Sequence, residues 1–109
     1  MRLQHLGTDT KQGGSPALYL SDRGTYVIQG WRTDQSERIE IPHALLGYLR
    51  EDTCLGALLH DTGHGTFLLM GAPLTDQEAL NQLEIPGHET AVEVPVGEEQ
   101  RPDALPARR

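Results

Sequence analysis

The chain has 109 residues, which is enough for one small domain with a single core and too short for a second domain. Its 12 glycines and its aromatic content of 5% favour a turn-rich sheet over a helical bundle. The formal net charge is −7 with no Lys or Arg between Arg50 and Arg101, which disfavours nucleic acids and membranes as partners, because both are bound through these cations.

The first half of the chain predicts a hairpin, a third strand and a helix. Residues 1–15 end in Gly-Gly-Ser-Pro, typical of a loop, and we expect them to form a flexible N-terminal arm. Residues 17–21 and 25–31 read as strands joined by a glycine turn, and the second carries apolar groups on both faces, which predicts a central position. Residues 38–41 alternate as a third strand, and Pro42 opens a helix to about Arg50.

The second half repeats the hairpin. Residues 65–71 read Gly-Thr-Phe-Leu-Leu-Met-Gly and match Gly-Thr-Tyr-Val-Ile-Gln-Gly at 24–30. Residues 55–60 and 66–70 are its predicted strands, Thr75 and Glu78 read as the capping box of a second helix, and residues 90–94 alternate as the last strand. Residues 97–109 contain too few apolar positions to order themselves, so a disordered tail is expected there.

These patterns predict an α+β fold. Residues 16–96 would form a single domain of two related units, about 16–52 and 53–96, with about six strands and two short helices in a mostly antiparallel sheet. The repeat is compatible with pseudo-twofold symmetry, and the sequence does not decide between a monomer and a homodimer.

One cluster has the chemistry of metal ligands. His60 and His64 lie four positions apart around Asp61, and zinc accepts nitrogen, oxygen and the sulfur of Cys54. A hairpin turn needs Asp and Gly for its own geometry, however, so a polar turn is the favoured interpretation. Cys54 has no neighbouring oxyanion motif, no glycine pattern fits a phosphate loop, and we expect neither catalysis nor a cofactor.

The charge asymmetry indicates a docking surface. Acids dominate the second unit, and we expect a basic protein to bind the face that carries them, with Trp31 as an apolar anchor. The residues of this predicted surface are Asp76, Glu78, Glu84, Glu89, Glu93 and Trp31. The single Cys54 fits a reducing compartment, and with no apolar leader a cytoplasmic location is expected.

Two resemblances point to regulation. The segments 15–31 and 88–95 resemble a family of small actinobacterial proteins that are often encoded beside helix-turn-helix regulators, which implies a regulatory accessory role and brings no catalytic residues. Residues 38–70 are similar to the swapped-hairpin transition-regulator and antitoxin domains, which dimerise and bind DNA through several Arg and Lys.

Three functions follow as hypotheses. The leading one is an acidic, non-enzymatic accessory protein that binds a basic protein, such as a transcription regulator. The alternatives are a swapped-hairpin dimer that binds DNA and a metal-binding protein or enzyme that uses His60 and His64.

Overall fold

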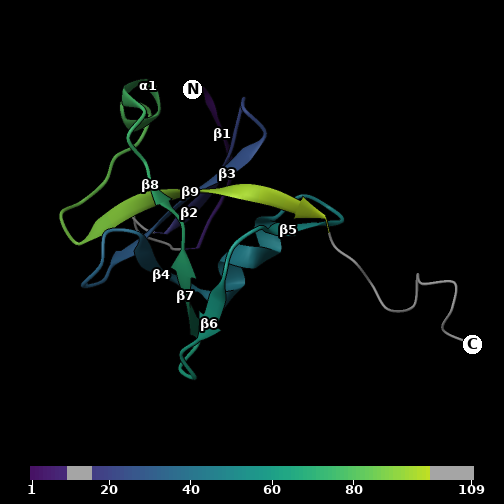
Figure 1. The fold of residues 1–109 in the computed structure, drawn as a ribbon, viewed down its shortest axis with the longest axis vertical. Helices are drawn as coiled ribbons and strands as arrows, with labels where there is room; N and C mark the ends of the chain where they lie inside the picture. Colours follow the sequence, from purple (N-terminus) through teal and green to yellow (C-terminus); the bar gives the residue numbers. More distant parts are fainter. Residues whose placement is uncertain (10–15, 99–109) are drawn as a thin grey trace, which may run out of the picture.

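The computed structural model describes residues 1–9 and 16–98, and within them the chain is mostly antiparallel sheet (Figure 1). The two helices of this part are short, a 3₁₀ helix η1 (His43–Tyr48) and a single α-helical turn α1 (Gln77–Leu80). The strands are β1 (Leu3–Thr8), β2 (Ala17–Ser21), β3 (Thr25–Arg32), β4 (Arg38–Pro42), β5 (Thr53–Leu55), β6 (Leu59–Asp61), β7 (Thr66–Met70), β8 (Ala72–Pro73) and β9 (Glu89–Glu98).

The pair of β3 and β9 is the centre of the sheet. These strands pair antiparallel from Thr25 opposite Pro95 to Trp31 opposite Glu89. The other side of β3 pairs first with β2 and then with β4, which continues the sheet to β7 and the terminal strand β6. The predicted central position of β3 is therefore confirmed. Its apolar residues on both faces are explained by the two cores that cover it, one on each side of the sheet.

Each face of the central pair packs into its own core. On one face Tyr26 and Ile28 of β3 and Val92 of β9 join a cluster that includes residues of η1, β4 and β7. On the other face Val27 and Ala91 pack in a second cluster with residues of α1 and the N-terminus. Both clusters contain side chains that are completely shielded from solvent.

The predicted α+β class with two helices is wrong. Nine strands in the described residues replace the expected six, and helical structure is limited to η1 and α1. The extra strands are β1, β5 and β8, of which β5 and β8 exist by pairing with the long strand β9. Short segments of two or three residues carry no periodic signal of their own, so only this distant partner makes them strands.

The ends of the domain also differ from expectation. Part of the expected flexible arm is strand β1, which pairs with β2 from Leu3 opposite Ser21 to Thr8 opposite Ala17, and Met1 is buried. Strand β9 continues through Gly97 and Glu98, because these residues pair with β5. The remainder of the predicted arm and tail lies outside the described residues.

The two predicted hairpins are present, but their units are joined differently. In the first unit the third strand β4 pairs with its own hairpin strand β3, whereas β9 pairs with β3 of the first unit rather than with β7. Gly71 allows the chain to turn from β7 onto β9, because a Cβ there would lie 2.8 Å from Val94 Cγ1.

Candidate functional site: the open face of β4, β7 and β6

One face of the sheet is covered at one end and open at the other. The register places Trp31 of β3 opposite Glu40 of β4, so the side of the sheet that carries Val27 continues onto the side of β4 that carries Arg38. Around β3 and β9 this side is covered by α1 and the N-terminal residues. Figure 1 places α1 and the N-terminus at one end of the molecule, and β6 at the other.

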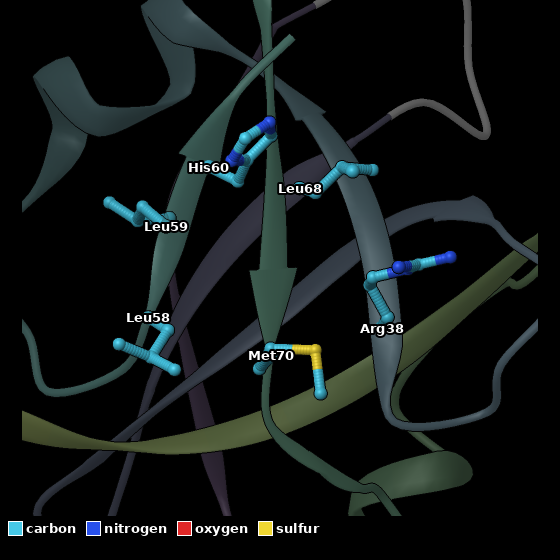
Figure 2. A pocket seen from close by; sticks show the side chains of 6 residues that line it. All are labelled: Arg38, Leu58, Leu59, His60, Leu68 and Met70. Carbon is cyan, nitrogen blue, oxygen red and sulfur yellow. The ribbon is translucent and has the colours of Figure 1, made fainter.

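The uncovered end contains a hollow of about 460 Å³ (Figure 2). Its lining residues, which we call the open sheet face, are Arg38, Leu58, Leu59, His60, Leu68 and Met70. Arg38, His60, Leu68 and Met70 share one face because β4, β7 and β6 are in register: Arg38 lies opposite Met70, and His60 lies opposite Leu68. Leu59 lies opposite Leu69, so it borders the hollow from the edge of the sheet. The alternate residues of β4 and β7, such as Ile39 and Leu69, point into the core on the reverse side.

Two leucines at the edge of the open sheet face are unusually exposed. Leu58 is 78% exposed and Leu59 is 38% exposed, and they belong to the three large hydrophobic residues that are exposed in the described part of the chain. In Figure 2 Leu58 lies beside Met70, while Leu59 points outward past the edge of the sheet. A solvent-exposed cluster of this type marks a surface for a protein or ligand more often than an ordinary surface does.

Arg38 supplies a polar border to the hollow. Its Nη2 donates a hydrogen bond of 2.6 Å to Asp34 Oδ1, so its charge is paired in the free protein. Its Nε is buried, and it is the one buried side-chain polar atom in residues 1–9 and 16–98 that has no hydrogen-bond partner. A buried donor without an acceptor is costly, so Arg38 carries an unsatisfied polar atom beside the hollow.

Two imidazole–carboxylate pairs lie near β7 on opposite sides of the sheet, since Glu40 is opposite Leu68 and Asp61 is opposite the core-packed Phe67. His64 Nε2 lies 3.1 Å from Glu40 Oε2, which also accepts from the Thr66 hydroxyl at 2.6 Å, and the hydroxyl bond is the main reason that the pKa of Glu40 is lowered. His43 Nε2 lies 3.2 Å from Asp61 Oδ1. The backbone N–H of Gly63 donates to the same oxygen and lowers the pKa of Asp61, so this carboxylate stays ionised at neutral pH.

The structure does not bring the predicted metal ligands together. His43 approaches Asp61, and His64 approaches Glu40, while Cys54 lies on β5 beside β9. In the described residues no three His, Cys, Asp or Glu side chains form a group that could hold a metal ion. The hairpin turn therefore has the polar interactions that a turn needs, and the metal-binding alternative has no ligand set in this part of the chain.

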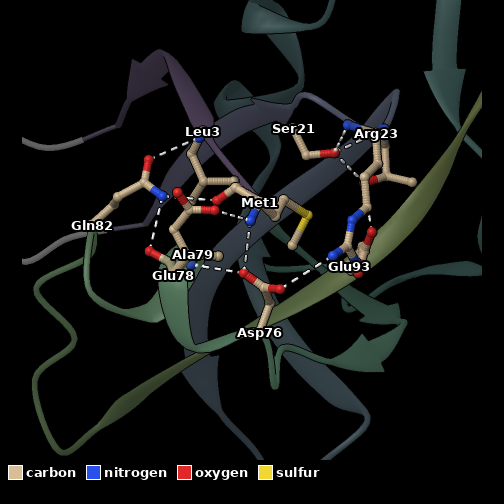
Figure 3. Close-up of polar contacts among 10 residues, drawn as sticks. Met1, Leu3, Ser21, Arg23, Asp76, Glu78, Ala79, Gln82 and Glu93 are labelled. Carbon is tan, nitrogen blue, oxygen red and sulfur yellow. Dashed lines mark hydrogen bonds and ion pairs between the residues drawn. The ribbon is translucent and has the colours of Figure 1, made fainter.

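Two acids of the predicted docking surface bind cations of the chain itself (Figure 3). The N-terminal ammonium lies 3.0 Å from Asp76 Oδ2 and also contacts Glu78 Oε1, while Arg23 Nη2 lies 3.3 Å from Asp76 Oδ1. Asp76 is also the N-cap of α1, because its Oδ2 accepts from the N–H of Ala79 at 3.0 Å. The expected capping box is thus wrong: Asp76 replaces Thr75 as cap, and Glu78 binds the ammonium.

The remaining predicted surface residues lie in different environments. Glu89 is 1% exposed and accepts a hydrogen bond of 2.7 Å from Gln29, so it lies beneath the surface. Glu93 accepts from the Thr25 hydroxyl at 2.7 Å. Glu84 is exposed, and Trp31 is partly exposed at the end of β3. The six residues therefore do not form one continuous group of free carboxylates.

The sequence of strand β7 carries a signal for the open sheet face. Strand β7 reads Thr-Phe-Leu-Leu-Met and has apolar residues on both faces, as β3 does. In a strand with only one buried face, the second apolar row is left for a partner. The surface signal in this chain is therefore the apolar row of Leu68 and Met70, together with Leu58.

No family model, curated protein or solved structure matches this chain. The helices in the part of the chain that the structure describes include none long and apolar enough to cross a membrane. The regulatory role and the swapped-hairpin fold implied by the two resemblances therefore stay predictions, and the arguments for function come from the geometry of the surface.

Proposed function

We propose that this protein is a non-enzymatic binding domain whose protein partner docks on the open sheet face. The observation that carries the proposal is the exposed apolar hollow formed by Leu58, Leu68 and Met70 on a sheet whose other end is covered by α1. Binding there would remove Leu58 from water, and each buried side chain of this size contributes about 1.5–3 kcal/mol.

The shape of the hollow favours a protein over a small molecule. Small-molecule sites enclose most of their ligand, whereas this hollow lies on an exposed sheet face beside a terminal strand. A side chain from a partner would fill it, and a polar group of the partner would contact the partly exposed side chain of Arg38 at the border. The rim of Arg38 and His60 around an apolar centre has the usual organisation of a protein interface.

The experiment compares two variants that add the same charge at opposite ends of the molecule. Leu58→Glu places a carboxylate in the hollow, and Gln77→Glu places one on exposed α1. The protein that copurifies with the wild-type chain from its native host is identified and titrated against both variants by calorimetry. We expect Leu58→Glu to weaken binding about tenfold or more, because a hot-spot truncation costs about 2 kcal/mol. Equal affinity of both variants would contradict the proposal.

A second candidate is the predicted docking of a basic protein on the acidic residues. Exposed Glu84, together with the absence of Lys and Arg between Arg50 and Arg101, supports it. Glu84→Lys should slow association of such a partner at low salt. Glu84 is the right residue to reverse, because Glu78 already contacts the N-terminal ammonium. An unchanged on-rate would leave these acids as solvated surface.

Under either candidate the accessory role beside a transcription regulator and the cytoplasmic location remain part of the proposal. The resemblance to the actinobacterial family supports the first, and the single Cys54 supports the second. Binding of DNA is the less favoured function, because the open sheet face offers only Arg38, and its guanidinium already pairs with Asp34.

A further inference from the structure

The strands β1 and β6, at the two ends of the sheet path, differ in how far other residues cover their outer edges. Strand β1 is irregular at the step from His5 to Gly7, and the ring of Tyr48 packs over Gly7. The backbone N–H of Leu3 donates to the side chain of Gln82, as Figure 3 also shows. A bulge and covering side chains are the usual means by which proteins prevent a terminal strand from pairing with another chain.

Strand β6 has no such protection in the described residues. It contains no Lys, Arg or Pro, and all three of its residues are exposed. The bonds from Met70 N to Leu58 O and from Thr62 N to Thr66 O show which backbone groups face β7. Because backbone groups alternate in direction along a strand, the N–H and C=O groups of Leu59 and Asp61 point away from the sheet. They have no backbone partner among residues 1–9 and 16–98, so they can pair with an added strand.

The side chains beside this edge specify what an added strand should contain. Leu58 and Leu59 offer apolar surface, and an apolar residue opposite Leu58 would also reach the hollow. Asp61 offers an ionised carboxylate at the other end of β6. A Lys or Arg opposite Asp61 is therefore favoured, in agreement with the acidity of the whole chain.

We propose that β6 accepts an antiparallel strand from a basic protein, and that this strand contains a basic residue followed by any residue and two apolar residues. This rests on the proposed function, since it names the segment that the open sheet face binds. In this register the basic residue lies opposite Asp61 and the apolar residues lie opposite Leu59 and Leu58. A second copy of the chain is disfavoured, because two molecules with a net charge of −7 repel each other and β6 of a second copy has no Lys or Arg to place opposite Asp61.

The probe is a fluorescein-labelled ten-residue peptide with Arg-Thr-Val-Leu at its centre, and its control has Glu in place of Arg. Fluorescence anisotropy with the full chain measures both affinities. We expect the Arg peptide to bind about two- to fivefold more tightly than the Glu peptide, the range for one cross-strand charge pair. Asp61→Lys should reverse this preference. Docking on the face without strand pairing would give no reversal, and absence of saturable binding by either peptide would overturn the proposal.

The backbone part of the proposal is tested with Leu59→Pro against Leu59→Ala. Proline removes only the outward N–H, since that group does not bond to β7, and a terminal strand tolerates proline. We expect Leu59→Pro to weaken the Arg peptide about tenfold more than Leu59→Ala does, through the lost hydrogen bond and the added ring. Equal affinities would overturn strand addition.

The same variants separate this inference from the proposed function. If the natural partner is lost with Leu58→Glu but retained with Leu59→Pro, the open sheet face is the docking site and strand addition is wrong. A wild-type dimer at neutral pH that Leu59→Pro abolishes would identify a second copy as the occupant of β6, which also overturns the inference. Sedimentation velocity measures that state directly.

Discussion

Tyr26 links the centre of the sheet to the start of β5, and its hydroxyl allows a quantitative test of the fold. The side chain is completely buried, and its hydroxyl accepts from the N–H of Arg50 at 2.9 Å and lies 2.6 Å from Thr53 Oγ1. Thr53 Oγ1 in turn donates to the carbonyl of Arg50 at 2.6 Å. The Tyr26 hydroxyl therefore donates to Thr53 and is the acceptor for the Arg50 N–H.

Tyr26→Phe should lower the free energy of unfolding by about 1–3 kcal/mol. The ring and its packing are kept, but the Tyr26 hydroxyl bonds to Arg50 N–H and Thr53 Oγ1 are both lost, and two hydrogen bonds contribute about this amount. Urea denaturation should show a lower midpoint with an unchanged m-value. Tyr48→Phe is the matched control, because that hydroxyl is exposed and makes a longer hydrogen bond of 3.4 Å.

The reasoning is refuted if Tyr26→Phe lowers the free energy of unfolding no more than Tyr48→Phe does. For Tyr48→Phe we expect a decrease of less than about 0.5 kcal/mol. Thr53→Val provides a further test. If the network acts as a unit, Tyr26→Phe and Thr53→Val should be non-additive, with a coupling of about 0.5 kcal/mol or more in a double-mutant cycle. Additive effects would mean that the two hydroxyls contribute independently.

Three further predictions test the core, the turn into β8 and the cap of α1. Ile28→Ala should cost about 2–5 kcal/mol of unfolding free energy by denaturant titration, because the residue is completely buried. Gly71→Ala should cost about 1–3 kcal/mol through its clash with Val94, whereas Gly47→Ala, with open space around it, should cost far less. The pKa of Asp76 lies below its ordinary 3.8, mainly because the N–H of the third α1 residue donates to it and then because of the N-terminal ammonium. The ionised carboxylate therefore stabilises the fold fully above pH 3.8, and this stabilisation is lost as the pH falls through the lowered pKa. Acid titration of Asp76→Asn should therefore show a shallower loss of stability below about pH 4.

The central strands could be predicted because their residues carry the signal locally. Strand β3 has apolar residues on both faces, and the turn before it contains Gly24 at a φ of 76°, a conformation that favours glycine. The same reasoning applied to β7 located the second hairpin. Local composition is enough to predict a strand such as β3, which is long and follows a tight turn.

The missed elements depend on distant partners. Strand β1 reads Leu-Gln-His-Leu-Gly-Thr, which lacks regular alternation, and it is held by β2 and by the cover of Tyr48. The predicted second helix begins one residue later than expected, with Asp76 as its cap, and ends at Leu80, because the following residues Gln82 and Leu83 form tighter i→i−3 turn bonds. The acids of the predicted docking face looked equivalent in the sequence, yet Glu89 is buried against Gln29 and Asp76 binds two cations.

The net negative charge of the chain opposes self-association through the exposed edge of β6. An unprotected terminal strand with Leu58 and Leu59 beside it is prone to pair with another copy, and a high net charge opposes that pairing. The opposition should fail near pH 5, the isoelectric point expected from the composition, where long-range repulsion between copies vanishes. We therefore expect the wild-type chain to self-associate in sedimentation velocity near pH 5 and to be monomeric at pH 7, with Leu59→Pro monomeric at both. High salt at pH 7 should act in the same direction by screening the charges. Self-association that persists in Leu59→Pro would show that another surface is responsible, and that the net charge does not protect β6.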